Sequence, residues 1–155
     1  MSRELRRVHP TWEHPKDTQG NYIPLSDGFD WDKDLTRWLE VAEEFESEEL
    51  AEAVGYYKPN SKEYMPRWTE DEATHYQWYE TVSEGTPVSP PMASKEALAA
   101  WLSGNHLDRL SGKKFTKEQW LKVVNQEWVI SGVLTPEKGF QSGTEYAVEK
   151  EEEDV

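Results

Sequence analysis

Histidines and closely spaced aspartates are the residues of this chain best suited to binding a metal. His9 and His14 each precede a proline and would supply half of a metal site. The chain has no cysteine, and the other two histidines, His75 and His106, stand at no ligand spacing from the first pair. We therefore predict neither a metal nor a cofactor, and we expect both His-Pro pairs to lie in extended chain.

Three aspartates, Asp30, Asp32 and Asp34, reproduce the spacing at the start of a calcium-binding loop. Such a loop needs glycine directly after the third aspartate. Here that glycine is missing, Lys33 interrupts the run, and Trp38 stands where a further oxygen ligand is required. Because acidic side chains are also favoured at the positive end of a helix dipole, we interpret the three aspartates as the start of a helix.

Nucleophilic catalysis has equally little support in the sequence. Ser83 and Ser89 are flanked by turn-forming residues, but no histidine stands where the sequence links it to either serine. The chain also lacks the glycine-rich phosphate loops, the His-Glu-x-x-His zinc motif and the Gly-x-Ser-x-Gly nucleophile motif. We predict that the protein is not an enzyme and has no catalytic residues.

Negative charge is the strongest feature of the composition, and most of it lies in one third of the chain. The 155 residues carry a formal net charge of -14, and residues 27–84 hold 17 Asp and Glu against 5 Lys and Arg, a net of -12. Such a field repels nucleic acid and anionic membranes and attracts basic protein surfaces. No apolar run resembles a signal peptide or a membrane span. We therefore expect a cytoplasmic protein that binds a basic protein surface, with no direct contact to nucleic acid or membrane.

The most acidic stretch coincides with the clearest helix pattern. From Asp30 to about Glu52, apolar residues recur at helical spacing and form one stripe, which predicts a single helix. Thr69 and Glu72 then form a capping box, which predicts a helical turn with three more acids. The candidate partner-binding residues are Glu43, Glu44, Glu46, Glu48, Glu49, Glu52, Glu70, Asp71 and Glu72.

These acidic residues allow two interpretations. They form either a solvated helix face that serves solubility or a carboxylate array that binds a basic partner. Six glutamates crowd the C-terminal half of the predicted helix, where the helix dipole opposes them. This unfavourable placement favours the second interpretation.

An aromatic stretch from residue 75 to residue 91 is the predicted centre of the fold. Its first part alternates, with Tyr76 and Trp78 on one face and Tyr79 on the other, which is typical of a strand packed on both sides. A turn at 83–85 and a proline-rich extended arm follow. The functional alternative is an aromatic platform for nucleic-acid bases, but the basic residues that such platforms use are missing nearby.

The remaining elements complete an α+β pattern. We expect helices at 94–103 and 116–126, and short strands at 22–25, 128–130, 133–134 and 146–148. The predicted fold is α+β, with three main helices packed on a small sheet of short, mostly antiparallel strands. Residues 1–148 should form a single compact domain, and 149–155 an acidic flexible tail.

Several motifs resemble one group of proteins over most of the chain. The two longest are Tyr-Ile-Pro-Leu-x-Asp-Gly at 22–28 and Tyr-Gln-x-Tyr-Glu-Thr-x-Ser-Glu-Gly-x-Pro-x-Ser-Pro at 76–90. Together with Trp12-x-His14-Pro15, they resemble small acidic proteins encoded by tailed bacteriophages and prophages. Pro91-Met92 departs from the more apolar pair expected after the Ser-Pro. The resemblance implies a phage source and setting rather than a mechanism.

A phage source favours an accessory factor that binds a host protein. The leading hypothesis is an inhibitor of a host nucleic-acid-binding defence complex in the cytoplasm of the infected bacterium, either an anti-CRISPR or an anti-restriction protein. Its carboxylates would occupy a basic groove of a nuclease or CRISPR effector complex in place of phosphates. One alternative is a phage structural or accessory protein whose charge serves solubility only. Another is a nucleic-acid-modifying enzyme with an unrecognised site.

Overall fold

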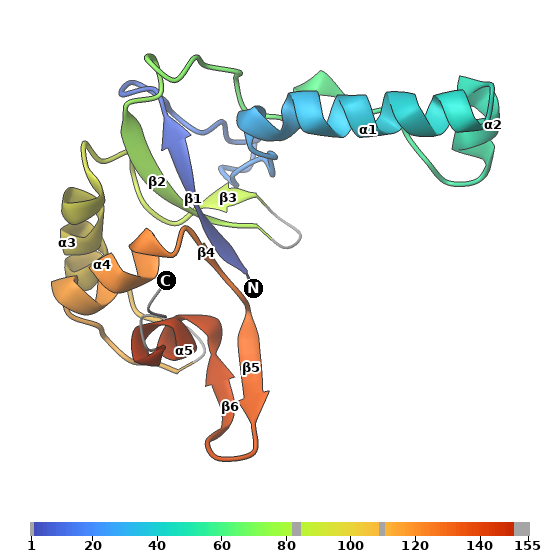
Figure 1. Cartoon of the computed structure of the whole chain (residues 1–155). Coiled ribbons are helices and arrows are strands. Elements are labelled where there is room, and N and C mark those ends of the chain that lie inside the picture. The colour runs from blue at the N-terminus through green and yellow to red at the C-terminus, as the bar shows by residue number, and fades with distance from the viewer. Residues whose placement is uncertain (1, 82–84, 109–110, 151–155) are drawn as a thin grey trace.

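A four-stranded antiparallel sheet forms the centre of the protein in a computed structural model that describes residues 2–81, 85–108 and 111–150. The spatial order of its strands is β3-β2-β1-β4 (Figure 1). The strands comprise β1 (Arg3–Val8), β2 (His75–Glu80), β3 (Thr86–Pro87) and β4 (Trp128–Val129). The long central pair, β1 and β2, runs from Arg3 opposite Glu80 to Val8 opposite His75.

The position of β1 goes beyond the sequence-based prediction. The sequence predicted extended chain near the N-terminus, but β1 pairs with β2 on one side and with β4 on the other, so it lies inside the sheet. Arg6 of this strand is buried, and its Nη1 donates to the carbonyl oxygen of Leu25 over 2.8 Å. The guanidinium also stacks 4.2 Å from the centre of the Tyr79 ring.

The alternation of β2 is confirmed, because the strand packs on both faces. Trp78 is fully buried on the face that α3 (Lys95–Asn105) and α4 (Lys117–Asn125) cover. Tyr79 is fully buried on the opposite face, against Val8, Leu25 and Met65. The sheet therefore separates a larger core under the helices from a smaller one under the loops.

Both helices of the larger core begin where their capping residues predict. Ser94 Oγ accepts a hydrogen bond from the backbone N–H of Ala97, and Thr116 forms a complete capping box with Gln119. The main core consists of fully or almost fully buried side chains. These are Trp78, Leu98, Ala99, Leu102, Phe115, Trp120, Val123, Val124, Val129 and Ala147.

The C-terminal part differs from its prediction. The strand expected at 146–148 is wrong, because these residues belong to α5 (Gly143–Glu149). A hairpin of β5 (Gly132–Thr135) and β6 (Gly139–Ser142) precedes this helix and forms a second sheet. Ser142 ends the hairpin and caps α5, since its Oγ accepts a hydrogen bond from the N–H of Glu145.

The predicted single helix from Asp30 to Glu52 is also wrong. The short 3-10 helix η1 (Gly28–Asp30) leads into α1 (Trp31–Glu44), and a separate helix, α2 (Glu48–Ala53), follows. Between the helices Glu46 adopts a positive φ of 58°, and Ser47 Oγ accepts a hydrogen bond from the N–H of Leu50. A left-handed residue followed by a new cap ends one helix and starts another.

The chain returns from α2 along α1 through residues 54–64, which include η2 (Ser61–Glu63). Figure 1 shows α1 extending away from the sheet, with α2 at its far end. We call residues 31–64 the acidic arm. Aromatic contacts hold its two sides together: Trp31 meets Tyr64 with 5.1 Å between ring centres, and Phe45 meets Tyr56 at 5.9 Å.

The expected fold class holds only in its coarser form. The protein has mixed α and β structure with a small antiparallel sheet, but the described residues form five α-helices and two sheets instead of three helices on one sheet. None of these helices is long and apolar enough to cross a membrane. Most of the predicted turn at 83–85 and part of the predicted tail lie outside the described residues, namely 83, 84 and 151–155.

Candidate functional site

The base of the acidic arm is tied to the body of the protein by a narrow set of backbone hydrogen bonds. Ser26 N–H donates to Glu63 O over 2.8 Å, and Met65 N–H donates to Ser26 O over 2.8 Å. The chain therefore leaves the body and re-enters it at neighbouring points. Tyr64 OH donates to Asp34 Oδ2 over 2.7 Å across the same base. Burial and this hydrogen bond raise the pKa of Tyr64 to about 12.

Six candidate glutamates gather at the distal end of the arm. They come from the last turn of α1, the turn that follows it, and α2. All six are exposed, and none takes part in an ion pair among residues 2–81, 85–108 and 111–150. The six residues are Glu43, Glu44, Glu46, Glu48, Glu49 and Glu52. The fold thus presents six carboxylates at the point farthest along the arm from the sheet (Figure 1).

The break in the helix changes the electrostatic argument for these residues. The sequence analysis placed all six where a helix dipole opposes negative charge. For Glu48 and Glu49 this is wrong, because both lie in the first turn of α2, where the dipole favours them. Glu43 and Glu44, at the end of α1, do face an unfavourable dipole. The helix dipoles therefore oppose fewer of the six glutamates than the dipole of one continuous helix would, which weakens the electrostatic reason for interpreting them as a binding array.

The other three candidate acids lie at the opposite end of α1. Glu70, Asp71 and Glu72 belong to a turn just before β2, and Glu70 Oε1 is 3.9 Å from Arg7 Nη2 of β1. Arg7 also stacks 4.8 Å from the ring of Phe29, directly before α1. With 14 residues at about 1.5 Å each, α1 separates the two acidic groups by about 21 Å. The structure does not bring all nine residues into one cluster.

The predicted capping box is present in this turn. Thr69 N–H and Oγ1 donate to Glu72 Oε1, and Thr69 Oγ1 accepts a hydrogen bond from the N–H of Glu72. These bonds lower the pKa of Glu72. The carboxylate of Glu72 thus already has partners within the protein, whereas the six distal carboxylates lack ion pairs in the described part of the chain.

Two basic side chains, one in the arm and one just beyond it, lie against aromatic rings of α1. Lys58 Nζ lies 5.6 Å from the centre of the Trp38 ring, and Arg67, just beyond the arm, lies 4.7 Å from that of Trp31. Lys33 Nζ pairs with Asp30 at 3.9 Å near the base. These cations therefore do not neutralise the distal carboxylates.

The histidines considered as metal ligands serve the fold. His14 is buried, with Nδ1 3.0 Å from Tyr79 OH and Nε2 2.5 Å from Ile23 O. Burial lowers the pKa of His14, so its neutral form is favoured. His9 Nδ1 contacts Thr11 Oγ1 over 2.8 Å. Within the described residues no group of three or more His, Asp or Glu side chains could hold a metal ion.

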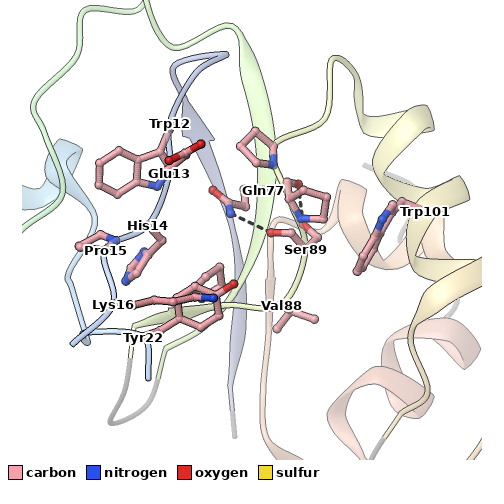
Figure 2. Close-up of a pocket in the computed structure, with 13 residues that line it drawn as sticks. Trp12, Glu13, His14, Pro15, Lys16, Tyr22, Gln77, Val88, Ser89 and Trp101 are labelled. Carbon is pink, nitrogen blue, oxygen red and sulfur yellow. Dashed lines mark hydrogen bonds between the residues drawn. The ribbon is translucent and has the colours of Figure 1, made fainter. Parts of the chain in front are cut away.

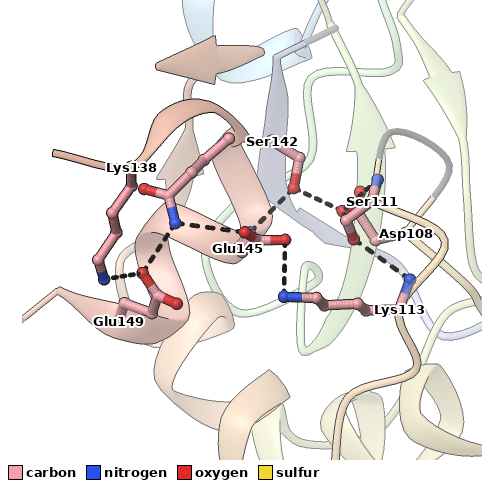
Figure 3. A network of polar contacts seen from close by, with 8 residues as sticks. Asp108, Ser111, Lys113, Lys138, Ser142, Glu145 and Glu149 are labelled. Carbon is pink, nitrogen blue, oxygen red and sulfur yellow. Dashed lines mark hydrogen bonds and ion pairs between the residues drawn. The ribbon is translucent and has the colours of Figure 1, made fainter. Parts of the chain in front are cut away.

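A polar network around Asp108 joins the C-terminal elements (Figure 3). Asp108 is buried, and its Oδ2 accepts hydrogen bonds from the hydroxyls of Ser111 and Ser142. Because Ser142 also caps α5, the network attaches this helix to the loop before α4. Lys113 and Glu145 form an ion pair at 3.2 Å between the same two segments. We interpret this network as structural.

An open groove at the β3 edge of the sheet, between the N-terminal loop and α3, was not predicted from the sequence (Figure 2). Its volume is about 740 Å³. Trp12, Tyr22 and Trp101 line it together with four prolines, and Gln77 and Ser89 also belong to its lining. Its aromatic residues are far apart in the sequence, so no local pattern reveals the groove. The one feature of the sequence that could have indicated a groove was the mixture of aromatic and proline residues in these segments.

The comparisons give no family for this protein. Family models, curated proteins and solved structures contain no match to the chain.

Proposed function

We propose that the protein acts by binding, and that its acidic arm binds a basic surface of a host nucleic-acid-binding defence complex and inhibits that complex. The observation that carries this proposal is the group of six exposed glutamates at the end of a projecting arm. Carboxylates of this kind can occupy a groove that otherwise attracts phosphates. We expect a nuclease of a restriction system or a CRISPR effector complex as the partner.

The shape of the arm supports insertion into such a groove. Its acids extend away from the sheet on two short helices, and the arm leaves the body through one narrow base. Exposed apolar side chains lie among the acids: Leu50 is 56% exposed, Val54 58% and Tyr57 75%. Protein interfaces commonly combine aromatic or aliphatic anchors with a polar rim. The mixture of apolar and acidic side chains on the arm therefore has the composition of a protein-binding surface.

The proposed setting is the cytoplasm of a bacterium infected by a tailed phage. The motifs at 22–28 and 76–90 carry this part of the proposal. Direct binding to nucleic acid is not part of the mechanism, because the net charge of -14 opposes it.

Charge reversal on the arm tests the function. We would replace Glu44, Glu48 and Glu52 by Lys and capture partners of the parent protein from a bacterial host at low salt. The captured partner should bind DNA or RNA, and nucleic acid should compete with the parent protein for it. The triple variant should fold like the parent, because all three side chains are exposed, but should bind the partner at least about tenfold more weakly.

A matched control carries the same change of six charge units away from the arm. Glu96, Glu118 and Glu137 are exposed, and the first two lie in first turns of helices, as Glu48 does. Reversal of these three residues should leave partner binding within about threefold of the parent. Equal loss in both variants would mean that net charge alone matters. Unchanged binding in the arm variant, or capture of only capsid or tail proteins, would overturn the proposal.

A further inference from the structure

The groove at the β3 edge of the sheet has aromatic walls, and contacts within the protein hold two of its rings. Trp12 Nε1 donates to Tyr79 OH over 3.0 Å, and the Trp12 ring meets Trp68 edge-on with 5.1 Å between ring centres. Tyr22 is 42% exposed and is held by His14, whose ring lies edge-on at 5.5 Å. Figure 2 shows Trp101, from α3, on the opposite side of the groove from Trp12. Preorganised rings lower the entropic cost of binding a ligand.

The buried polar side chains of the groove, Gln77 and Ser89, already have partners within the protein. Gln77 Nε2 donates to Ser89 O over 2.7 Å, and Gln77 Oε1 accepts from Tyr79 OH over 3.2 Å. Ser89 Oγ accepts from the N–H of Trp78 over 3.0 Å and donates to Pro90 O. A sugar needs many hydrogen-bond partners, which these buried and occupied groups offer poorly. The groove therefore suits a ligand that binds by ring and aliphatic contacts.

The prolines of the groove restrict how a peptide could bind there. β3 is the edge strand of the sheet, and an exposed edge often accepts an extra strand. Here Pro87 of β3 and the following Pro90 and Pro91 have no backbone N–H, so they cannot donate to an added strand. A polyproline II segment needs no such ladder, because its side chains dock between aromatic rings.

The charge of the groove and of the whole protein indicates which residues should flank the prolines of such a peptide. Glu13 is exposed at the groove and takes part in no ion pair within the described residues. Lys16 is the one lysine or arginine among the described lining residues, and its Nζ lies 5.0 Å from the centre of the Tyr22 ring. The net charge of -14 further attracts a basic ligand.

We propose that this groove is a second binding site, and that it takes an extended, proline-rich peptide segment with arginine or lysine beside the prolines. The prolines would pack against Trp12 and Trp101, and a basic side chain would pair with Glu13. This site is independent of the acidic arm, so the proposal does not depend on the proposed function.

The test is a titration of ¹⁵N-labelled protein followed by heteronuclear NMR. The ligand is a synthetic acetylated and amidated peptide that repeats Arg-Pro-Pro three times. It should bind saturably with a Kd below about 1 mM. It should shift the indole N–H signals of Trp12 and Trp101 and backbone signals at 12–22 and 87–101. A peptide with every proline replaced by alanine has equal charge and should bind at least about tenfold more weakly.

Glu13→Lys is the matched protein variant, because this side chain is exposed and should not affect folding. It should weaken binding of the basic peptide about threefold, the size typical of one exposed ion pair. Three results would overturn the proposal: no saturable shifts, equal binding of the alanine peptide, or shifts confined to the glutamates at 43–52. Saturable binding of chitohexaose at the same indoles without peptide binding would identify a sugar site instead and would equally contradict it.

Discussion

Asp27, a partly buried residue, caps the short helix that leads into the acidic arm. Its Oδ1 accepts a hydrogen bond from the N–H of Phe29 over 3.2 Å and so caps η1. Burial raises the pKa of Asp27 to about 6, although that hydrogen bond and the charge of Arg6 act in the opposite direction. The fold therefore favours the neutral form of this carboxyl more than water does, at the point from which the arm emerges.

This pKa predicts how stability depends on pH. A carboxyl whose pKa is higher in the folded chain binds its proton more tightly there, so its contribution is favourable at low pH and is lost as pH rises from about 4 to about 6. Asp27→Asn keeps an oxygen acceptor for Phe29. We expect the variant to be more stable than the parent at pH 7, by at most about 3 kcal/mol.

Chemical denaturation between pH 4 and pH 7 measures this effect. The advantage of Asp27→Asn over the parent should grow across that range. Asp32→Asn removes the same formal charge from an exposed position of α1 and serves as the control. A lower stability of Asp27→Asn than of the parent at pH 7 would show that the charged carboxylate is needed at this cap.

At the scale of elements, the sequence predicted structure well where the signal was local. Ser94 and Thr116 cap α3 and α4 as expected, and the alternation of β2 matches its two buried faces. Long-range contacts decided the elements that were missed. β1 becomes a central strand by pairing with residues more than 60 positions away, and α5 replaces a predicted strand because Ser142 caps it against the Asp108 network.

The candidate site was predictable to a similar extent. The acidic residues were identified from composition alone, because the charge of a side chain follows from its residue type and does not depend on its contacts. The break at Glu46 and the separation of the acids at 43–52 from those at 70–72 depend on backbone conformation and on contacts across the base of the arm. The groove was not predicted because Trp12 and Trp101 are far apart in the sequence. Only the folded sheet brings them to opposite sides of the same groove.

A substitution at Gly143 tests how closely α5 packs against residue 130. A Cβ at this position would lie 1.4 Å from Ile130 O, so the first residue of α5 has no room for a side chain. We expect Gly143→Ala to lower the free energy of unfolding by about 3 kcal/mol or more, because backbone must move to relieve the overlap. Urea denaturation followed by tryptophan fluorescence measures the change.

Gly104, near the end of α3, is the matched control. A Cβ there would have no atom within 4 Å, and the site is helical. Gly104→Ala should therefore raise the free energy of unfolding by up to about 1 kcal/mol. Similar effects of the two substitutions would contradict the close approach of α5 to residue 130.

At the scale of the whole molecule, charge and core are segregated. The main core lies between the sheet and α3, α4 and α5, whereas the acidic arm, residues 31–64, holds 10 Asp and Glu against 4 Lys and Arg, a net charge of -6. Within the acidic arm three residues are buried, Trp38 and Ala42 in α1 and Ala51 in α2, and all three lie outside both core clusters. This arrangement separates the surface that we propose for binding from the structure that determines stability.

The last prediction uses this separation. Hydrogen bonds between Ser26 and the chain at residues 63–65 keep the two ends of the arm together, so residues 35–60 can be replaced by a short Gly-Ser linker. The replacement removes seven acidic and two basic residues. Trp31, Asp34 and Tyr64 remain to close the base. We expect the shortened protein to fold, because the main core and both of its covering helices are untouched.

Circular dichroism and thermal unfolding test the first half of this expectation, and binding tests the second. The shortened protein should keep a cooperative transition within a few degrees of the parent, since less than about 1 kcal/mol should be lost. It should lose binding to the captured defence complex but keep binding of the Arg-Pro-Pro peptide in the groove. An unfolded product would show that the arm is needed for the core, and full retention of complex binding would locate the interface elsewhere. Loss of both binding activities in a folded product would contradict the independence of the two sites.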